Sequence, residues 1–179
     1  MVINLIVSNA RAHETTIDSW LENICGSSDS KTKAVVIRCD YANSVNSKID
    51  ALIMIHSRIV GESSEAGEVT VFFEKSKGIN KVSIQHYGEM GKVNFNYYYD
   101  NGHLYLINRE LTHYDRPINM QGSTVESIDR DMFLIYGESL IGKLTEKGYI
   151  NGSDDDNEVV ADAIFTVNKV LKLLPLVIK

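Results

Sequence analysis

The sequence predicts an α+β protein: an antiparallel meander sheet of about five to six strands, with N-terminal helices and a long C-terminal helix packed on it. Three observations lead to this fold class. The middle of the chain alternates apolar and polar residues with the period of a strand. The dipeptide Asn101-Gly102 separates two such runs, as the turn of a tight hairpin does. Near the C-terminus, apolar residues recur at helical spacing instead.

Length and composition are those of one globular domain spanning residues 1–179, with 44% hydrophobic and 23% charged residues. The 24 acidic and 18 basic residues give a formal net charge of −6. This charge argues against nucleic acid or an anionic membrane surface as a partner. It favours a basic protein partner, and the alternative is that the acidity serves only solubility. No apolar run approaches the roughly 20 residues that a membrane-spanning helix needs, so we expect no membrane span.

The N-terminal segment has two interpretations. An apolar run, Val2–Val7, leads into a short stretch that ends in the Ala-x-Ala pattern of Ala10 to Ala12. Such a pattern is typical of the end of a secretion signal, of which residues 1–12 would be a remnant. The run is shorter than a usual signal core and lacks a basic start, so a plain first strand is the alternative.

Cys25 and Cys39 are the only cysteines, which leaves one disulfide pairing and no CxxC spacing for a metal or redox site. In an oxidising compartment the two would form a disulfide, and its loop of about 15 residues would contribute roughly 3 kcal/mol. In the cytosol they would instead be small buried hydrophobic residues.

Two N-terminal helices are predicted. The first follows a Thr-x-x-Asp cap at Thr15–Asp18 and ends at Gly26. Its apolar face is Ile17, Trp20, Leu21 and Ile24. The run Ala34–Cys39 fits either a buried strand or a helix. A second helix is expected from about Asn46 to Val60, because the cap pattern recurs at Ser47–Asp50. Its apolar face would be Ile49, Leu52, Ile53, His56, Ile59 and Val60.

The meander follows from Glu68 onward. Its predicted strands contain Val69–Phe73, Val82–His86, Val93–Tyr99 and the run that begins at Leu104, with a turn at Gly88–Gly91. The segment Gln121–Arg130 is expected to be a loop. A last hairpin joins Met132–Tyr136 to Leu140–Leu144. The long C-terminal helix follows Asp154–Asp156, whose acids would cap it, and ends before Pro175.

A two-residue turn at Asn101-Gly102 would set the register of the central hairpin, with Tyr98 opposite Tyr105. One face would then be core: Phe95, Tyr97, Tyr99, Leu104 and Leu106. The other face would be Asn94, Asn96, Tyr98, Tyr105, Ile107 and Arg109. Its aromatic, amide and guanidinium groups are typical of interface hot spots, so these six are the predicted partner-binding residues. The alternative is that a helix covers them.

Known catalytic and metal-binding motifs are missing from the sequence. The five histidines show no HExxH spacing, and Asp154–Asp156 lacks the alternating ligands of an EF-hand loop. Gly88–Lys92 lacks the Walker A spacing, and Gly137–Ile141 lacks the final glycine of a nucleophile elbow. We therefore predict no catalytic residue, no metal ligand and no cofactor. Scattered Asp and Glu residues could still form a carboxylate pair in space, so a hydrolase is kept as a hypothesis beside the two given below.

Part of the chain resembles a group of poorly characterised bacterial secreted proteins and lipoproteins, which carry a GE-x-GK turn, a YYF-DNGKL-like hairpin and a later Y-x-x-PI. The matching segments are Phe72–Glu74, Gly88–Lys92, Tyr97–Leu104 and Tyr114–Ile118. The resemblance covers about residues 68–145 and implies export to the bacterial periplasm or cell envelope. It implies no activity, because its motifs are turns and strands. The alternative location is the cytoplasm.

A looser likeness, in character rather than in matched residues, is to bacterial immunity proteins, which neutralise toxins and are often small, acidic and poor in motifs. The resulting hypothesis is a non-enzymatic immunity or inhibitor protein that binds a basic toxin or enzyme. The alternative hypothesis is an exported envelope protein with a ligand-binding or structural role.

Overall fold

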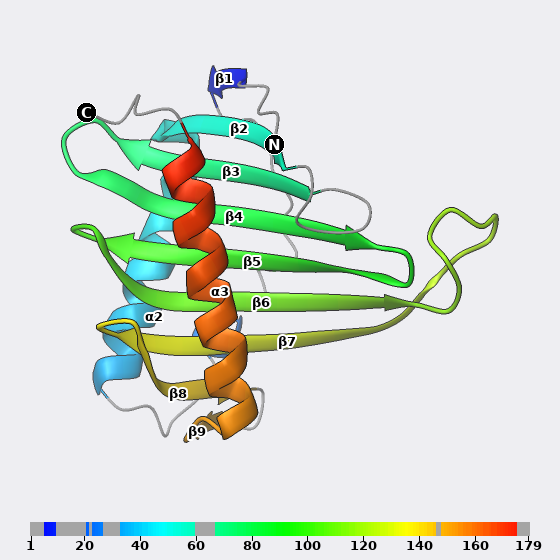
Figure 1. Cartoon of the computed structure of the whole chain (residues 1–179). Coiled ribbons are helices and arrows are strands. Elements are labelled where there is room, and N and C mark those ends of the chain that lie inside the picture. Colours follow the sequence, from blue (N-terminus) through cyan, green and yellow to red (C-terminus); the bar gives the residue numbers. More distant parts are fainter. Residues whose placement is uncertain are drawn as a thin grey trace.

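The computed structural model of the chain describes residues 6–9, 21, 23–26, 33–59, 67–145 and 148–174 (Figure 1). Within these residues, nine strands form one antiparallel sheet, and their order in the sheet is their order in the chain. The α+β class, the antiparallel meander and the C-terminal helix are therefore confirmed. The predicted count of five to six strands was too low.

The strands are β1 (Ile6–Asn9), β2 (Ile53–Ile59), β3 (Gly67–Glu74), β4 (Gly78–Gly88), β5 (Gly91–Asp100), β6 (His103–Tyr114), β7 (Val125–Tyr136), β8 (Ser139–Thr145) and β9 (Gly148–Ile150). The helices are α2 (Lys33–Ser47), the short 3₁₀ helix η1 (Ile49–Ala51) and α3 (Asp154–Leu173).

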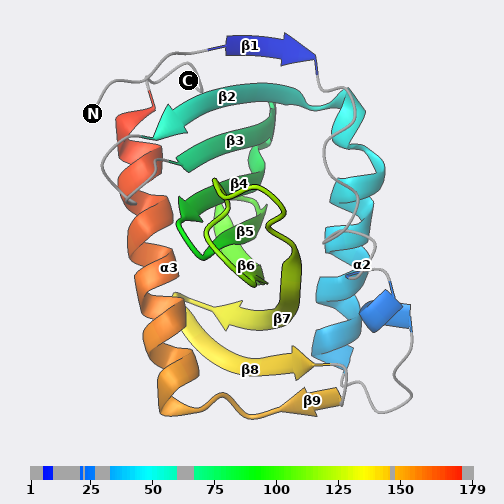
Figure 2. The ribbon, with the colours of Figure 1, turned by 90° about the vertical axis from the view of Figure 1, so that its right-hand side faces the viewer.

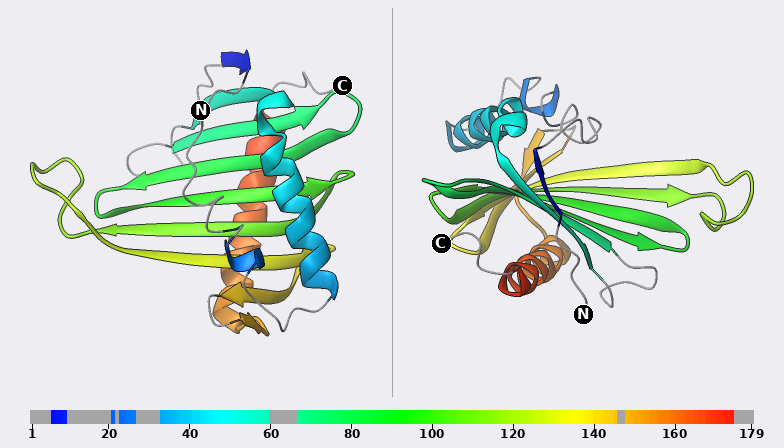
Figure 3. Two further views of the ribbon diagram at one scale, coloured as in Figure 1. Left: turned by 180° about the vertical axis from the view of Figure 1, so that it is seen from behind. Right: turned by 90° about the horizontal axis from the view of Figure 1, so that it is seen from above.

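The sheet lies between two helices. Seen from above in Figure 3, α2 and α3 lie on opposite faces of the sheet, and Figure 2 shows the same arrangement end-on. The α3 face buries Ile55, Ile59, Val71, Val82, Ile84, Tyr97, Ile107 and Phe133 together with Val160, Ala163, Ile164, Val167 and Val170 of the helix. The α2 face buries Phe72, Tyr98, Leu106, Met132, Leu134 and Leu144 with Val35, Cys39, Ala42 and Val45 of α2. Each face of the sheet therefore has its own buried layer, and the layer beneath α2 also contains the buried polar residues Lys81, Asn96 and Asn108.

The predicted helix from Asn46 to Val60 was wrong. Helix α2 ends at Ser47, and Ile53–Ile59 form β2. Along β2, Ile55 and Ile59 are buried on the α3 side. Leu52, just before the strand, is buried on the α2 side. Ile53, Ile55 and Ile59 share the α3 face of β2, whereas Arg58 on the other face is exposed. Together with the apolar residues just before the strand, these isoleucines also fit the helical period.

His56 was placed on the apolar face of that helix, and this too was wrong. It lies on β2, where its Nδ1 is 3.0 Å from Oγ1 of Thr70 on β3. The run Ala34–Cys39, which fitted a helix or a strand, is helical and belongs to α2. The loop predicted for Gln121–Arg130 is only partly one, because β7 begins at Val125.

The first predicted helix is described only in part. Its cap at Thr15–Asp18, with Ile17 and Trp20, lies outside the described residues, whereas Leu21 and Ile24 are helical and buried. Within the signal-like residues 1–12, only Ile6–Asn9 are described. They form β1, which pairs with β2 at Ile6 with His56 and at Asn9 with Ile53.

Helix α3 has the predicted acidic cap. The Ser153 hydroxyl accepts a hydrogen bond from the Asp156 N–H, and the Asp156 carboxylate accepts one from the Ser153 N–H, which is a capping box. The last hairpin is also confirmed, since Tyr136 pairs with Ser139 around the Gly137-Glu138 turn.

The turn at Asn101-Gly102 is confirmed, with φ of 49° and 80° at the two residues, as a type I′ turn requires. The register is right for Asp100 with His103 and for Tyr99 with Leu104. Beyond these pairs it was wrong, because a β-bulge places Tyr98 opposite Leu106, and Tyr105 is the extra residue. Each following residue of β6 is therefore shifted by one position.

Candidate functional site

The predicted partner-binding residues do not form one outward surface. Because of the bulge, Ile107 and Arg109 lie on the α3 side, where the Arg109 guanidinium lies 5.7 Å from the ring centre of Phe133. Tyr98 and Tyr105 stay on the α2 side. The six residues are therefore split between the two faces of the sheet, and the grouping Asn94, Asn96, Tyr98, Tyr105, Ile107 and Arg109 was wrong.

Helix α2 covers the tyrosine half of that grouping, which was the alternative that the sequence left open. The side chain of Tyr98 has no exposed surface, and Asn96 is 5% exposed. Ile107 is equally buried, but on the α3 side. The ring of Tyr105 packs edge-on against Tyr41 of α2, with ring centres 4.9 Å apart. Burial raises the pKa of Tyr105, with the charges of Tyr41 and Asp100 as smaller causes. Tyr98 and Tyr105 therefore pack in the layer beneath α2.

A polar contact in the same layer fixes the helix in position. Asn46 of α2 and the Tyr98 hydroxyl lie 3.2 Å apart, and Lys81 Nζ donates a hydrogen bond of 3.1 Å to Asn46 Oδ1. The Lys81 ammonium also lies 5.2 Å from the centre of the Tyr98 ring, a cation–π geometry. The buried lysine is thus satisfied within the fold.

A second charged cluster joins the sheet to the start of α3. Lys143 Nζ lies 2.6 Å from Asp131 Oδ1 and 3.0 Å from Asp156 Oδ1, and Arg109 donates to the same Asp131 carboxylate. Burial lowers the pKa of Lys143, but the hydrogen bonds and charges of Asp131 and Asp156 outweigh this and raise it. Two cations balance two carboxylates, and the contacts link β6, β7 and β8 to the start of α3.

The far ends of β4 to β7 project past both helices, most clearly at the right of Figure 1 and in the view from above in Figure 3. We name residues 88–91 and 114–128 of this projection the arm. Five large apolar side chains of the arm are between 39% and 53% exposed: Met90, Ile118, Met120, Val125 and Ile128. Isolated exposed apolar residues are common, but such a group at a projecting tip is typical of an interaction surface.

Hydrogen bonds connect the two segments of the arm and close its loop. The loop after β6 is closed by Asp115, whose N–H donates to the Thr124 carbonyl at 3.1 Å and whose Oδ1 accepts from the Thr124 N–H at 2.8 Å. The loop is joined to the β4–β5 turn, because the Ile118 N–H donates to the Glu89 carbonyl at 2.9 Å. A surface that is ordered before binding loses less entropy when a partner docks.

The unpaired charge of the arm is negative. Its one basic residue, Arg116, forms an ion pair with Asp115 at 3.1 Å. Glu89 and Glu126 are exposed, and within the described part of the chain neither carboxylate has an ion-pair partner. The sequence did not identify this surface, because residues 121–130 read as an ordinary polar loop. An apolar loop residue that packs inward has the same sequence pattern as one that is exposed.

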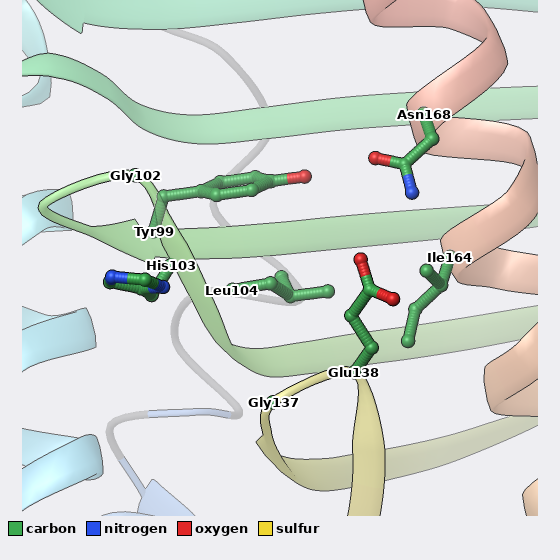
Figure 4. Close-up of a pocket in the computed structure, with 8 residues that line it drawn as sticks. All are labelled: Tyr99, Gly102, His103, Leu104, Gly137, Glu138, Ile164 and Asn168. Atoms are coloured by element: carbon green, nitrogen blue, oxygen red, sulfur yellow. The ribbon is translucent and has the colours of Figure 1, made fainter.

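At the opposite end of the sheet lies a cavity of about 140 Å³, which we name the end pocket. It is lined by Tyr99, Gly102, His103, Leu104, Gly137, Glu138, Ile164 and Asn168. These residues come from the β5–β6 turn, the β7–β8 turn and α3, so the fold brings together segments that are far apart in the sequence. Figure 4 shows the Tyr99 hydroxyl, the Glu138 carboxylate and the Asn168 amide directed toward the space between the turns and the helix.

The polar groups of the end pocket lack partners among the described residues. Tyr99 is 8% exposed, and its buried hydroxyl makes no hydrogen bond. Burial raises the pKa of Tyr99, so this hydroxyl stays protonated. The side chains of Glu138 and Asn168 likewise form no ion pair or hydrogen bond with a described residue.

The two cysteines form a disulfide, with their Cα atoms 5.6 Å apart, which ties the segment 23–26 to α2. Among the described residues, no group of three or more histidine, cysteine, aspartate or glutamate side chains is placed to hold a metal ion. No helix in the same part of the chain is long and apolar enough to cross a membrane. Comparison with known proteins finds no matching family model, no matching curated protein and no matching solved structure.

Proposed function

We propose that this protein is a non-enzymatic binding protein of the immunity or inhibitor class, and that the arm is its contact surface for a basic toxin or enzyme. The observation that carries the proposal is the exposure of Ile118 and Met120 on a loop that backbone hydrogen bonds hold in place. Apolar anchors that need little ordering are typical of tight protein interfaces.

The charge of the arm supports a basic partner. Its two unpaired carboxylates, Glu89 and Glu126, flank the apolar tip in the sequence, and the whole chain carries a formal charge of −6. A positively charged partner would associate faster because of this charge, and the association rate would fall as the salt concentration rises. This surface replaces the one predicted around Tyr98, which is buried beneath α2.

The proposal is tested with the toxin domain that we expect a neighbouring gene to encode. The purified pair should form a complex of fixed stoichiometry in light scattering, and the chain should block the toxic activity. The double substitution Ile118→Ser, Met120→Ser should weaken the complex by at least about 1 kcal/mol, roughly fivefold. Both side chains are exposed, so the variant should fold normally.

Phe165→Ser is the matched control, since Phe165 is 69% exposed on α3, outside the arm. It should leave the affinity unchanged. If Phe165→Ser weakens the complex and the arm variant does not, the arm is not the contact surface. If the pair forms no complex at all, the immunity function itself is wrong.

The disulfide between Cys25 and Cys39 favours a second candidate function, an exported envelope protein with a ligand-binding or structural role. Disulfides persist in oxidising compartments such as the bacterial periplasm and are rare in the cytosol. The test is to block free thiols in intact cells with an alkylating reagent. The mass of the protein from the periplasmic and cytosolic fractions is then measured by mass spectrometry. Protein recovered from the periplasm with both cysteines unmodified supports export, whereas doubly modified cytosolic protein contradicts it.

A further inference from the structure

We propose that the end pocket binds a primary aliphatic ammonium group, which belongs either to a small free amine or to a lysine side chain of another protein. The pocket lies at the end of the sheet opposite the arm, so this inference goes beyond the function proposed above and is tested separately from it.

The size of the end pocket fits such a group. Its volume of about 140 Å³ resembles that of an engineered cavity of roughly 150 Å³ that takes up benzene. A four-carbon chain with a terminal nitrogen has fewer heavy atoms than benzene. Leu104 and Ile164, both largely buried, provide apolar walls for the carbon chain.

The unpaired polar groups match the three N–H donors of an ammonium. The Tyr99 hydroxyl oxygen, the Glu138 carboxylate and the Asn168 amide oxygen each accept a hydrogen bond, and Figure 4 shows that amide oxygen on the side toward Tyr99. A buried hydroxyl without a partner costs free energy, so a ligand that supplies the missing hydrogen bond is favoured. Each acceptor comes from a different element: β5, the β7–β8 turn and α3.

The charge of Glu138 favours a cation over a neutral group. Its carboxylate has no ion pair among the described residues, so its negative charge is available to a ligand. Gly137 and Glu138 have φ values of 55° and 68°, as the two-residue turn between β7 and β8 requires, and this turn places Glu138 at the pocket.

The first experiment titrates the full chain with n-butylammonium chloride and follows the backbone amide signals by NMR, with 1-butanol as the neutral comparison. We expect saturable shifts at residues 102–104, 137–138 and 164–168 with the amine, and binding at least tenfold weaker with the alcohol. Equal binding of both would overturn the proposal, as would shifts that rise linearly without saturation.

Variants then test the acceptors. Glu138→Gln and Tyr99→Phe should each weaken amine binding about tenfold. Glu126→Gln, which removes an exposed carboxylate of the arm, should leave it unchanged. Tyr99→Phe removes only a hydroxyl without a partner, so the variant should fold. Unchanged affinity in both pocket variants would show that the shifts come from binding elsewhere and would overturn the proposal.

A third titration separates the two sources of the ammonium group. Lysine that is blocked at both its amino and carboxyl ends presents the same four-carbon amine, attached to a peptide backbone. If it binds at least as tightly as n-butylammonium, the pocket takes a lysine side chain. If it binds more than tenfold more weakly, the pocket takes a free small amine.

Discussion

Tyr97 and Tyr98 are neighbours on β5 and are both completely buried, yet their side chains lie in opposite layers of the protein. Tyr97 packs beneath α3, where its hydroxyl has no hydrogen-bond partner. Tyr98 packs beneath α2, where its hydroxyl contacts Asn46. The two residues therefore provide a matched pair for measuring what a buried hydroxyl contributes to the free energy of unfolding.

Removing these two hydroxyls should have opposite effects. Tyr98→Phe breaks the contact with Asn46, and we expect it to lower the free energy of unfolding by about 1 kcal/mol. Tyr97→Phe removes an unsatisfied polar atom, so it should be neutral or raise that free energy by up to about 1 kcal/mol. Urea denaturation of both variants measures the difference. An equal loss in the two would contradict the hydrogen-bond assignment.

The disulfide should contribute a large part of the stability. Cys25 and Cys39 are 14 residues apart, and closing a loop of that size contributes about 3 kcal/mol on the chain-entropy model. The double substitution Cys25→Ala, Cys39→Ala should lower the free energy of unfolding by about that amount. Adding a thiol reductant should destabilise the parent protein and leave the variant unaffected. A reductant effect of equal size on both would point to a cause other than this bond.

The elements that the sequence predicted well are those whose signals are local. The Asn101-Gly102 turn depends on positive φ at two residues, and the start of α3 depends on a cap between Ser153 and Asp156. Each signal lies within a few residues of the chain. The turn type and the helix start followed from them without knowledge of the tertiary structure.

The errors arose where tertiary structure decided the outcome. The run Ile53–Ile59 is a strand that pairs with β1 and β3, but its isoleucines fit the period of a helix as well as that of a strand. The bulge at Tyr105 then placed Ile107 and Arg109 on the other face, and the predicted binding surface was lost with that shift. The end pocket joins residues from β5 to α3, a proximity that only the folded chain creates.

The turn that carries Glu138 should become more stable with glycine. Glu138 has a φ of 68°, and glycine adopts this conformation without a steric penalty. Glu138→Gly should therefore raise the free energy of unfolding by about 1 kcal/mol. The reverse exchange at the other hairpin, Gly102→Ala, should lower it by a similar amount, because Gly102 has a φ of 80°. If Glu138→Gly is destabilising instead, the carboxylate makes a favourable contact in the free protein.

The cap of α3 should make stability fall in acid. Burial works to raise the pKa of Asp156, but hydrogen bonds from Ser153 and the charge of Lys143 outweigh it, and the pKa is lowered. A carboxyl whose pKa is lower in the folded than in the unfolded state contributes stability at pH values above the unfolded pKa, about 4. That contribution is lost as the pH falls through the folded pKa.

We therefore expect Asp156→Asn to be less stable than the parent at pH 7 and to lose less stability between pH 4 and pH 2. Urea denaturation over this pH range measures both effects. Asp155→Asn is the control: Asp155 is an exposed acid of the same helical turn, and its side chain has no partner among the described residues. The free energy of unfolding of that variant should depend on pH as steeply as that of the parent. If the curves of Asp156→Asn and the parent run parallel, the acid sensitivity comes from other carboxyl groups. The contact between Lys143 and Asp156 would then join β8 to α3 without making that junction sensitive to pH.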